Sequence, residues 1–188
     1  MPTFYEGSPI AEIEQTVSAD EWAGAYYTAQ STLFPIRRRE VKAGICVTAA
    51  VLLGSIIPVY RFRFSTVVGP VCGILFALAL AAAFYFFQPN EIRRWGRTLY
   101  RANALLSIPE KITVYRDSVI IENEHEKILE YWTDFAKCVE TKDAFVIAGG
   151  LERNLLTIQK RGLPKEQTDA LSVHFANTFA TRYEKTGR

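Results

Sequence analysis

Two neighbouring stretches of the chain, 43–60 and 65–87, are almost entirely apolar and contain no charged side chain. A bilayer core of about 30 Å takes about 20 apolar residues in helical form. A charge at the centre of such a helix costs about 2.5–3.5 kcal/mol. A buried helical hairpin of a soluble protein is the alternative, and arginines on both flanks favour the membrane. The pattern therefore predicts a transmembrane helical hairpin over 43–87.

Basic residues lie on both sides of the predicted hairpin. Six arginines are candidates for contacts with lipid headgroups: Arg37, Arg38, Arg39, Arg93, Arg94 and Arg97. The loop between the two stretches carries only Arg61 and Arg63. Because loops rich in Lys and Arg stay in the cytoplasm, the charge distribution predicts a multi-pass protein with both termini cytoplasmic.

Small residues recur at a spacing of four in both apolar stretches, with Gly54 in the first and Gly69, Gly73 and Ala77 in the second. Such rows let helix backbones approach closely, and packing drives helix association in lipid. Two interpretations remain open. The rows face each other within one hairpin, or the row from Gly69 faces a second copy of the chain and gives a homodimer.

The segments next to the hairpin, 1–42 and 88–106, are polar. Ile10, Ile13 and Val17 are candidate strand or hydrophobic-staple residues. Ser18 with Glu21 forms a capping box that predicts a helix starting near Ala19 and reaching as far as Leu33. The aromatic residues of this helix suit either the membrane interface or packing on a soluble domain. Residues 88–106 are interpreted as a basic helical stalk.

From residue 107 onward the apolar positions alternate with period two. Strands are expected at 112–115, 118–122, 127–131, 136–140, 144–147 and 154–159. The last stretch, 164–183, repeats apolar residues at helical spacing, with Pro164 suited to its first turn. Short consecutive strands closed by one amphipathic helix predict an α+β domain over 107–188.

The composition excludes some functions. The chain has 188 residues and a net charge of +2, too small for a nucleic-acid-binding protein. Its cysteines, Cys46, Cys72 and Cys138, have neither disulfide nor metal-ligand spacing. His125 lies among glutamates in a predicted turn and lacks ligand geometry, and His174 is expected to pack on the last helix. We therefore expect no metal, no cofactor and no enzymatic activity.

Three short stretches carry a family resemblance: 130–135 with its tryptophan, 138–141, and 155–161 before the last helix. In these stretches the chain resembles the YcxB-like family of small bacterial membrane proteins. Where the family has a proline, this chain has Gln159, while Lys160 and Arg161 match. The resemblance implies two membrane spans and a C-terminal pleckstrin-homology-like domain. It also implies location in the bacterial inner membrane, and it brings no catalytic residue.

Four residues of the C-terminal domain are candidates for binding. Lys160, Arg161 and Lys165 lie between the last strand and the last helix, where they contact phosphate headgroups, an acidic partner or only solvent. Trp132 fills the core or lines a partner groove. The combined hypothesis is an α+β membrane protein whose hairpin anchors a cytosolic module that binds protein or lipid, as an accessory, regulatory or immunity factor. Alternatives are a membrane-interface enzyme acting on lipid and an oligomerising structural membrane protein.

Overall fold

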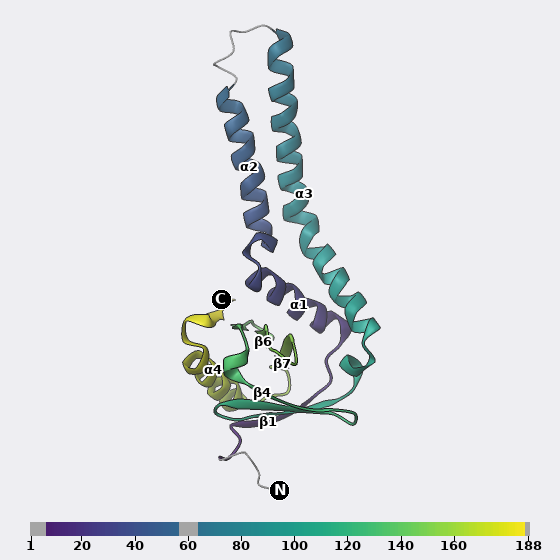
Figure 1. Ribbon diagram of the computed structural model, residues 1–188, viewed down its shortest axis with the longest axis vertical. Helices are drawn as coiled ribbons and strands as arrows, with labels where there is room; N and C mark the ends of the chain where they lie inside the picture. The colour runs from purple at the N-terminus through teal and green to yellow at the C-terminus, as the bar shows by residue number, and fades with distance from the viewer. Residues whose placement is uncertain (1–6, 57–63, 187–188) are drawn as a thin grey trace. The chain divides into compact units, whose positions relative to one another are not determined.

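The computed structural model describes residues 7–56 and 64–186, and these form two compact units. One unit, here called the sheet unit, contains the described residues up to Leu33 and those from Arg93 onward. The other, here called the helical unit, is Phe34–Ile92. Within these described ranges the fold is α+β, with two four-stranded sheets and four α-helices: α1 (Ala19–Leu33), α2 (Arg39–Ile56), α3 (Phe64–Ala102) and α4 (Lys165–Phe179) (Figure 1). Short 3₁₀ turns connect some of these elements: η1 (Pro35–Arg37), η3 (Ala104–Ser107), η4 (Trp132–Asp134) and η5 (Ala180–Arg182).

Sheet A is entirely antiparallel and follows the predicted alternation. Its strands, in spatial order, are β1 (Ala11–Gln15), β2 (Glu110–Val114), β3 (Ser118–Glu122) and β4 (Lys127–Tyr131). In β2, the side chains of Ile112 and Val114 are fully buried, whereas Lys111, which lies next to Ile112 along the strand, is exposed. Such alternation is expected when one face of a sheet packs on a core.

Sheet B lies against the inner face of sheet A. Its strands, in spatial order, are β7 (Leu155–Gln159), β6 (Ala144–Ala148), β5 (Lys137–Glu140) and β8 (Tyr183–Lys185). All residues of β6 and β7 are buried, so this sheet is covered on both faces. The inner face contributes Phe145, Ile147 and Ile158 to a core completed by Leu171 and Phe175 of α4.

The outer face of sheet B is covered by α1. Ala25 and Ala29 pack on Val139 and Val146, and Trp22 joins them. In Figure 1, sheet B therefore lies between sheet A and α1 within the sheet unit. Of the two positions considered for the N-terminal helix, the structure supports packing on the protein's own domain.

The N-terminal segment belongs to the same compact unit as the C-terminal domain. β1 pairs along its whole length with β2, from Ala11 opposite Val114 to Gln15 opposite Glu110. The predicted capping box is confirmed, because Glu21 accepts hydrogen bonds from the backbone N–H of Ser18 at 2.8 Å and from its hydroxyl at 2.7 Å. The helix begins at Ala19 and ends at Leu33 as expected.

In the helical unit, α2 and the first part of α3 contact each other. The chain 64–102 is one helix, so it continues through Pro89 into the predicted stalk. By length and composition, one described helix segment, Val71–Ala102, is long and apolar enough to cross a membrane. The segment α2 does not meet that criterion, because its 18 residues include Arg39, Glu40 and Lys42. The last part of the predicted first span, 57–60, lies outside the described residues.

The end of the last helix differs from the prediction. The helix α4 ends at Phe179 rather than at Tyr183, because Ala180 adopts φ 46° and breaks the helical run. Tyr183 instead begins β8, which pairs in parallel with β5. The 3₁₀ turn η5 therefore occupies the stretch that was expected to be the last turn of the helix, and β8 (Tyr183–Lys185) follows it.

Candidate functional site

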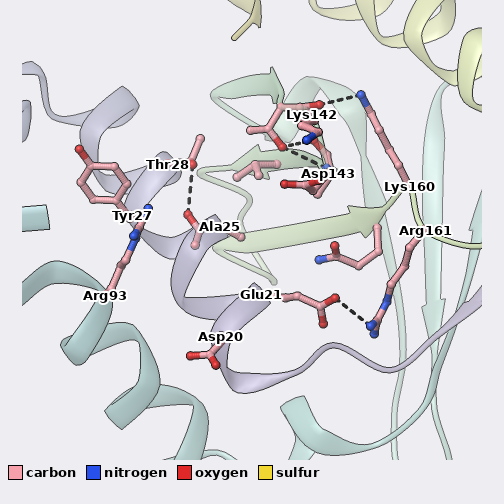
Figure 2. A pocket seen from close by; sticks show the side chains of 15 residues that line it. Asp20, Glu21, Ala25, Tyr27, Thr28, Arg93, Lys142, Asp143, Lys160 and Arg161 are labelled. Carbon is pink, nitrogen blue, oxygen red and sulfur yellow. Dashed lines mark hydrogen bonds and ion pairs between the residues drawn. The ribbon is translucent and has the colours of Figure 1, made fainter. Parts of the chain in front are cut away.

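A groove of about 790 Å³ lies between α1 and one end of sheet B, entirely within the sheet unit. Its floor is apolar and includes Ala25, Ala144 and Val146. Its rim is charged. In Figure 2, Tyr27 and Arg93 lie on one side, and Lys142 and Asp143, from the turn between β5 and β6, lie on the other.

Gly24 lines the groove without a structural reason for lacking a side chain. No atom lies within 4 Å of the position that a Cβ would occupy there. Gly96, the glycine of α3 that faces α1, is different, because a Cβ there would lie 3.0 Å from Cα of Ala23. A glycine inside a helix costs about 1 kcal/mol relative to alanine. Gly96 offsets this cost by close helix packing, whereas Gly24 only leaves space in the groove.

Several charges around the groove neutralise one another. Arg161 contacts Glu21 at 3.1 Å and donates to the carbonyl oxygen of Thr16 at 3.0 Å (Figure 2). Arg97 pairs with Asp20 at 2.7 Å.

Other charges have no such partner. Within the described residues Lys142 and Asp143 have no side-chain ion pair, and the guanidinium of Arg93 contacts only the ring of Tyr27, at 5.4 Å. The groove therefore presents two cations, Lys142 and Arg93, and one carboxylate that are not compensated inside the protein.

The ammonium of Lys160 makes its polar contacts inside the protein. It lies 2.8 Å from a carboxylate oxygen of Glu140 and 2.7 Å from the carbonyl oxygen of Thr141. It also lies 4.7 Å from the centre of the Phe145 ring. With 15% of its side chain exposed, Lys160 joins β5 to the end of β7.

Glu140 is the centre of a buried polar cluster. Besides Lys160, its carboxylate accepts hydrogen bonds from Ser172 of α4 at 2.6 Å and from Tyr183, and it pairs with Lys185 at 2.8 Å. Burial alone would raise the pKa of Glu140, but these donors outweigh it and lower the pKa to about 2. Burial and the Glu140 hydrogen bond raise the pKa of Tyr183 to about 12. The cluster holds a charged carboxylate beneath the C-terminal strand.

Trp132 fills the core instead of lining a surface. It is 1% exposed and contacts Phe135, Phe175 and Phe179 with ring centres 5.3–6.2 Å apart. Its indole N–H donates to the carbonyl oxygen of Tyr115 at 3.0 Å. Of the two roles considered from the sequence, packing is the one that this position supports.

His174 lies beside this aromatic cluster. Its ring packs edge-on against Trp132 at 6.0 Å, and its buried Nε2 has no hydrogen-bond partner in the part of the chain that the structure describes. Burial lowers the pKa of His174, which keeps the ring neutral. The expected packing role of this histidine fits its surroundings.

The remaining predicted binding residues lie apart from one another. Lys165 is the exposed first residue of α4 and does not line the groove. Arg94 is exposed on α3.

The arginines that precede the predicted hairpin belong to the helical unit. The guanidinium groups of Arg37 and Arg39 stack on Phe34 and Tyr85 at 4.7 and 4.6 Å from the ring centres, and Arg38 begins the turn into α2.

The predicted small-residue rows meet within the helical unit. A Cβ on Gly54 would lie 3.7 Å from the side chain of Ile74, and one on Gly73 would lie 3.2 Å from that of Leu53. Ala77 is 8% exposed. The contacts at Gly54 and Gly73 therefore match the interpretation in which the rows face each other. Among the described residues, no atom lies within 4 Å of the Cβ position of Gly69.

Sequence reasoning missed the polar link between the two sheets. Gln15 of β1 donates to the carbonyl oxygen of Thr157 at 2.6 Å, and its Oε1 accepts from the backbone N–H of Gln159 at 2.9 Å. A proline at 159, as in the family that the chain resembles, lacks this N–H. In the sequence, this link was indicated by Gln159 standing where the family has a proline. Its hydrogen-bonding partner, Gln15, lies 144 residues away along the chain.

No protein-family model and no curated protein sequence matches the chain. The resemblance to the YcxB-like family therefore stays a prediction that rests on the short stretches quoted above. In the part of the chain that the structure describes, no group of three or more His, Cys, Asp or Glu side chains is placed to hold a metal ion.

Proposed function

We propose that the chain is a membrane protein whose helical unit crosses the bilayer twice and anchors the sheet unit as a binding module. The observation that carries this proposal is the pairing of β1 with β2. The chain leaves the sheet unit after Leu33 and returns to it at Arg93. Both points must lie on one side of a bilayer, so the segment between them crosses an even number of times. If α3 crosses, the segment that contains α2 crosses as well.

The exposure of the helical unit supports insertion into lipid. Its largest apolar side chains face outward, including Leu75, Phe76 and Phe87 at 62%, 66% and 68% exposure, while Ala50 and Ala81 are buried. Water-soluble proteins rarely expose contiguous apolar surface of this extent. Small residues inside and large apolar residues outside are the arrangement expected for helices packed in lipid.

The sheet unit supports a recognition role. Two packed sheets, antiparallel except for the β5–β8 pair, with a helix after β7, agree with the pleckstrin-homology-like organisation that the resemblance implies. Among its groups with strongly shifted pKa values, Glu140 and Tyr183 are hydrogen-bonded to each other inside the fold, and Cys138, whose pKa is raised by burial, is 0% exposed. Fold alone does not supply function. The binding role is inferred from the groove and from anchoring at a surface.

Retention of the full chain in membranes washed with alkaline carbonate tests the anchor. We expect the wild-type chain to stay in the membrane fraction and the double variant Leu75→Arg/Phe76→Arg to leave it, since each central arginine costs about 2.5–3.5 kcal/mol. Leu151→Arg is the matched control, because Leu151 is 80% exposed in the sheet unit. Release of the wild-type chain by carbonate contradicts the proposal.

Labelling of single cysteines in sealed vesicles tests the number of crossings. Cys46 and Cys72 are first replaced by alanine, and Cys138, which is 0% exposed in the sheet unit, stays as a buried thiol that the reagent does not reach. Cysteines at Ile10 and Val173, which are 36% and 62% exposed in the sheet unit, are expected to react from one side. A cysteine at Arg61 is expected to react from the other side. Reaction of all three from the same side contradicts two crossings.

Self-association is a second candidate, favoured by the open surface at Gly69. Gly73 already faces Leu53 within the helical unit, so a contact with a second copy would use Gly69 and its neighbour Val68, which is 49% exposed. Crosslinking of the full chain in membranes tests this candidate. Gly69→Leu is expected to abolish the crosslinked dimer, and a dimer that survives the substitution contradicts it.

A further inference from the structure

We propose that the groove between α1 and sheet B binds the headgroup of an anionic phospholipid from the bilayer that anchors the chain. This inference rests on the proposed membrane anchoring and adds a ligand to it. It is argued from the space at Gly24, from the charges on the rim, and from the position of Arg93 on α3.

The space in the groove has the size of a ligand site. Its volume of about 790 Å³ falls in the range of about 300–1,000 Å³ that small-molecule sites occupy. The floor is formed by Ala25, Ala144 and Val146, which suits the apolar part of a ligand. Gly24 keeps this space open, because no packing contact uses the missing side chain. A helix whose only requirement was to cover sheet B would carry alanine there.

The charges on the rim favour an anion. Glu21 and Asp20 are neutralised by Arg161 and Arg97. Lys142 and Arg93 then oppose a single carboxylate, that of Asp143, and a net positive charge remains. A phosphodiester accepts charge-assisted hydrogen bonds from such ammonium and guanidinium groups.

The position of Arg93 favours a lipid as the source of the phosphate. Arg93 follows Phe87, the end of the apolar segment, by six residues on the same helix. At 1.5 Å per residue this is about 9 Å along the helix axis. The headgroup region extends about 5–7 Å beyond each side of the hydrocarbon core, so a long arginine side chain can extend back into it. A free phosphate ion would leave the apolar floor without a partner.

Native mass spectrometry of the full chain from nanodiscs with equal amounts of phosphatidylglycerol and phosphatidylcholine tests the proposal. We expect the wild-type chain to retain phosphatidylglycerol preferentially. Lys142→Ala and Arg93→Ala are each expected to lower its retention about tenfold, the effect of one lost charge-assisted hydrogen bond. Gly24→Leu is expected to do the same by filling the groove while keeping every charge. Lys165→Ala is the matched control, because this exposed lysine lies outside the groove.

Three results would overturn the proposal. If Gly24→Leu retains as much phosphatidylglycerol as the wild-type chain, and its melting temperature is no lower, the groove is not the binding site. If both Lys142→Ala and Arg93→Ala retain as much phosphatidylglycerol as the wild-type chain, the rim cations do not bind the lipid. If the wild-type chain retains phosphatidylcholine as well as phosphatidylglycerol, the assignment to an anionic lipid is wrong. Carbonate washing separates these failures from failure of the anchor, because a chain can stay in the membrane and still retain no phosphatidylglycerol.

Discussion

Replacing Glu140 by glutamine should detach the C-terminal strand and destabilise the sheet unit. The glutamine has nearly the same shape but removes the negative charge shared by Lys160 and Lys185. Lys160 is left as a nearly buried cation without an anionic partner, which is the costly outcome for such a pair. The hydrogen bonds from Ser172 and Tyr183 also weaken, because they end on a carboxylate.

The magnitude follows from the pKa of the Glu140 carboxyl. Its fall from 4.5 to about 2 means that folding favours the charged form. At about 1.36 kcal/mol per unit, and with a reduction because Lys185 is 61% exposed, this gives about 2–3 kcal/mol at neutral pH. Because the folded-state pKa is below that of the unfolded chain, the stabilisation is complete above about pH 5 and is lost as the pH falls toward 2.

Urea unfolding of the full chain in detergent, followed by near-ultraviolet circular dichroism, measures this difference. We expect Glu140→Gln to lose about 2–3 kcal/mol at pH 7 and progressively less below about pH 4.5. Amide exchange should increase in β8, whose neighbour Thr186 donates its N–H to the Glu140 carbonyl oxygen at 2.8 Å. Glu122→Gln is the matched control. Its pair with Lys127 is about half exposed and is worth less than about 1 kcal/mol.

Two outcomes would refute this reasoning. If Glu140→Gln and Glu122→Gln cost the same at pH 7, the buried cluster contributes no more than a surface ion pair. If the cost of Glu140→Gln stays constant between pH 7 and about pH 3, the stabilisation does not come from the charged carboxylate.

Three further measurements test other parts of the fold. Gly24→Ala should raise the free energy of unfolding by about 0.5–1 kcal/mol, whereas Gly96→Ala, which crowds α1, should lower it by about 1–3 kcal/mol in the same urea assay. Because burial lowers the pKa of His174, the unfolded chain binds its proton first. The free energy of unfolding should therefore fall as the pH drops below about 6.5, and this fall should be smaller in His174→Phe. A pH titration of the melting temperature of both chains checks this. Gln15→Ala leaves the N–H of Gln159 without its partner and should cost about 1–3 kcal/mol of unfolding free energy, whereas no loss would mean that water replaces the amide.

Local signals in the sequence predicted most strands and the start of α1. Alternation identified β3 and β4 at their observed bounds, and the Ser18–Glu21 capping box fixed the first helix. The second strand begins two residues earlier than expected, at Glu110. That residue is a buried carboxylate paired with Arg153 at 2.8 Å, and nothing near it in the sequence indicates this partner.

Long-range contacts account for what the sequence did not predict. The turn after α4 contains no glycine, so the change to β8 at Tyr183 had no local signal. The groove draws on α1, α3 and the two turns that follow β5 and β7, and no single segment contains it. Lys160 had been considered for contacts with headgroups or solvent, and its pairing with Glu140 depends on the strand order of sheet B.

The pairing of β1 with β2 also sets the order of events during synthesis. The first strand leaves the ribosome about a hundred residues before its partner, because Ala11 lies opposite Val114. At about 5–20 residues per second, β1 waits roughly 5–20 s for β2. Both apolar stretches are made in that interval, so with the anchor proposed above membrane insertion would precede completion of sheet A. A delay in releasing the helices from the insertion machinery would therefore leave β1 without its hydrogen-bonding partner and open to chaperones and proteases.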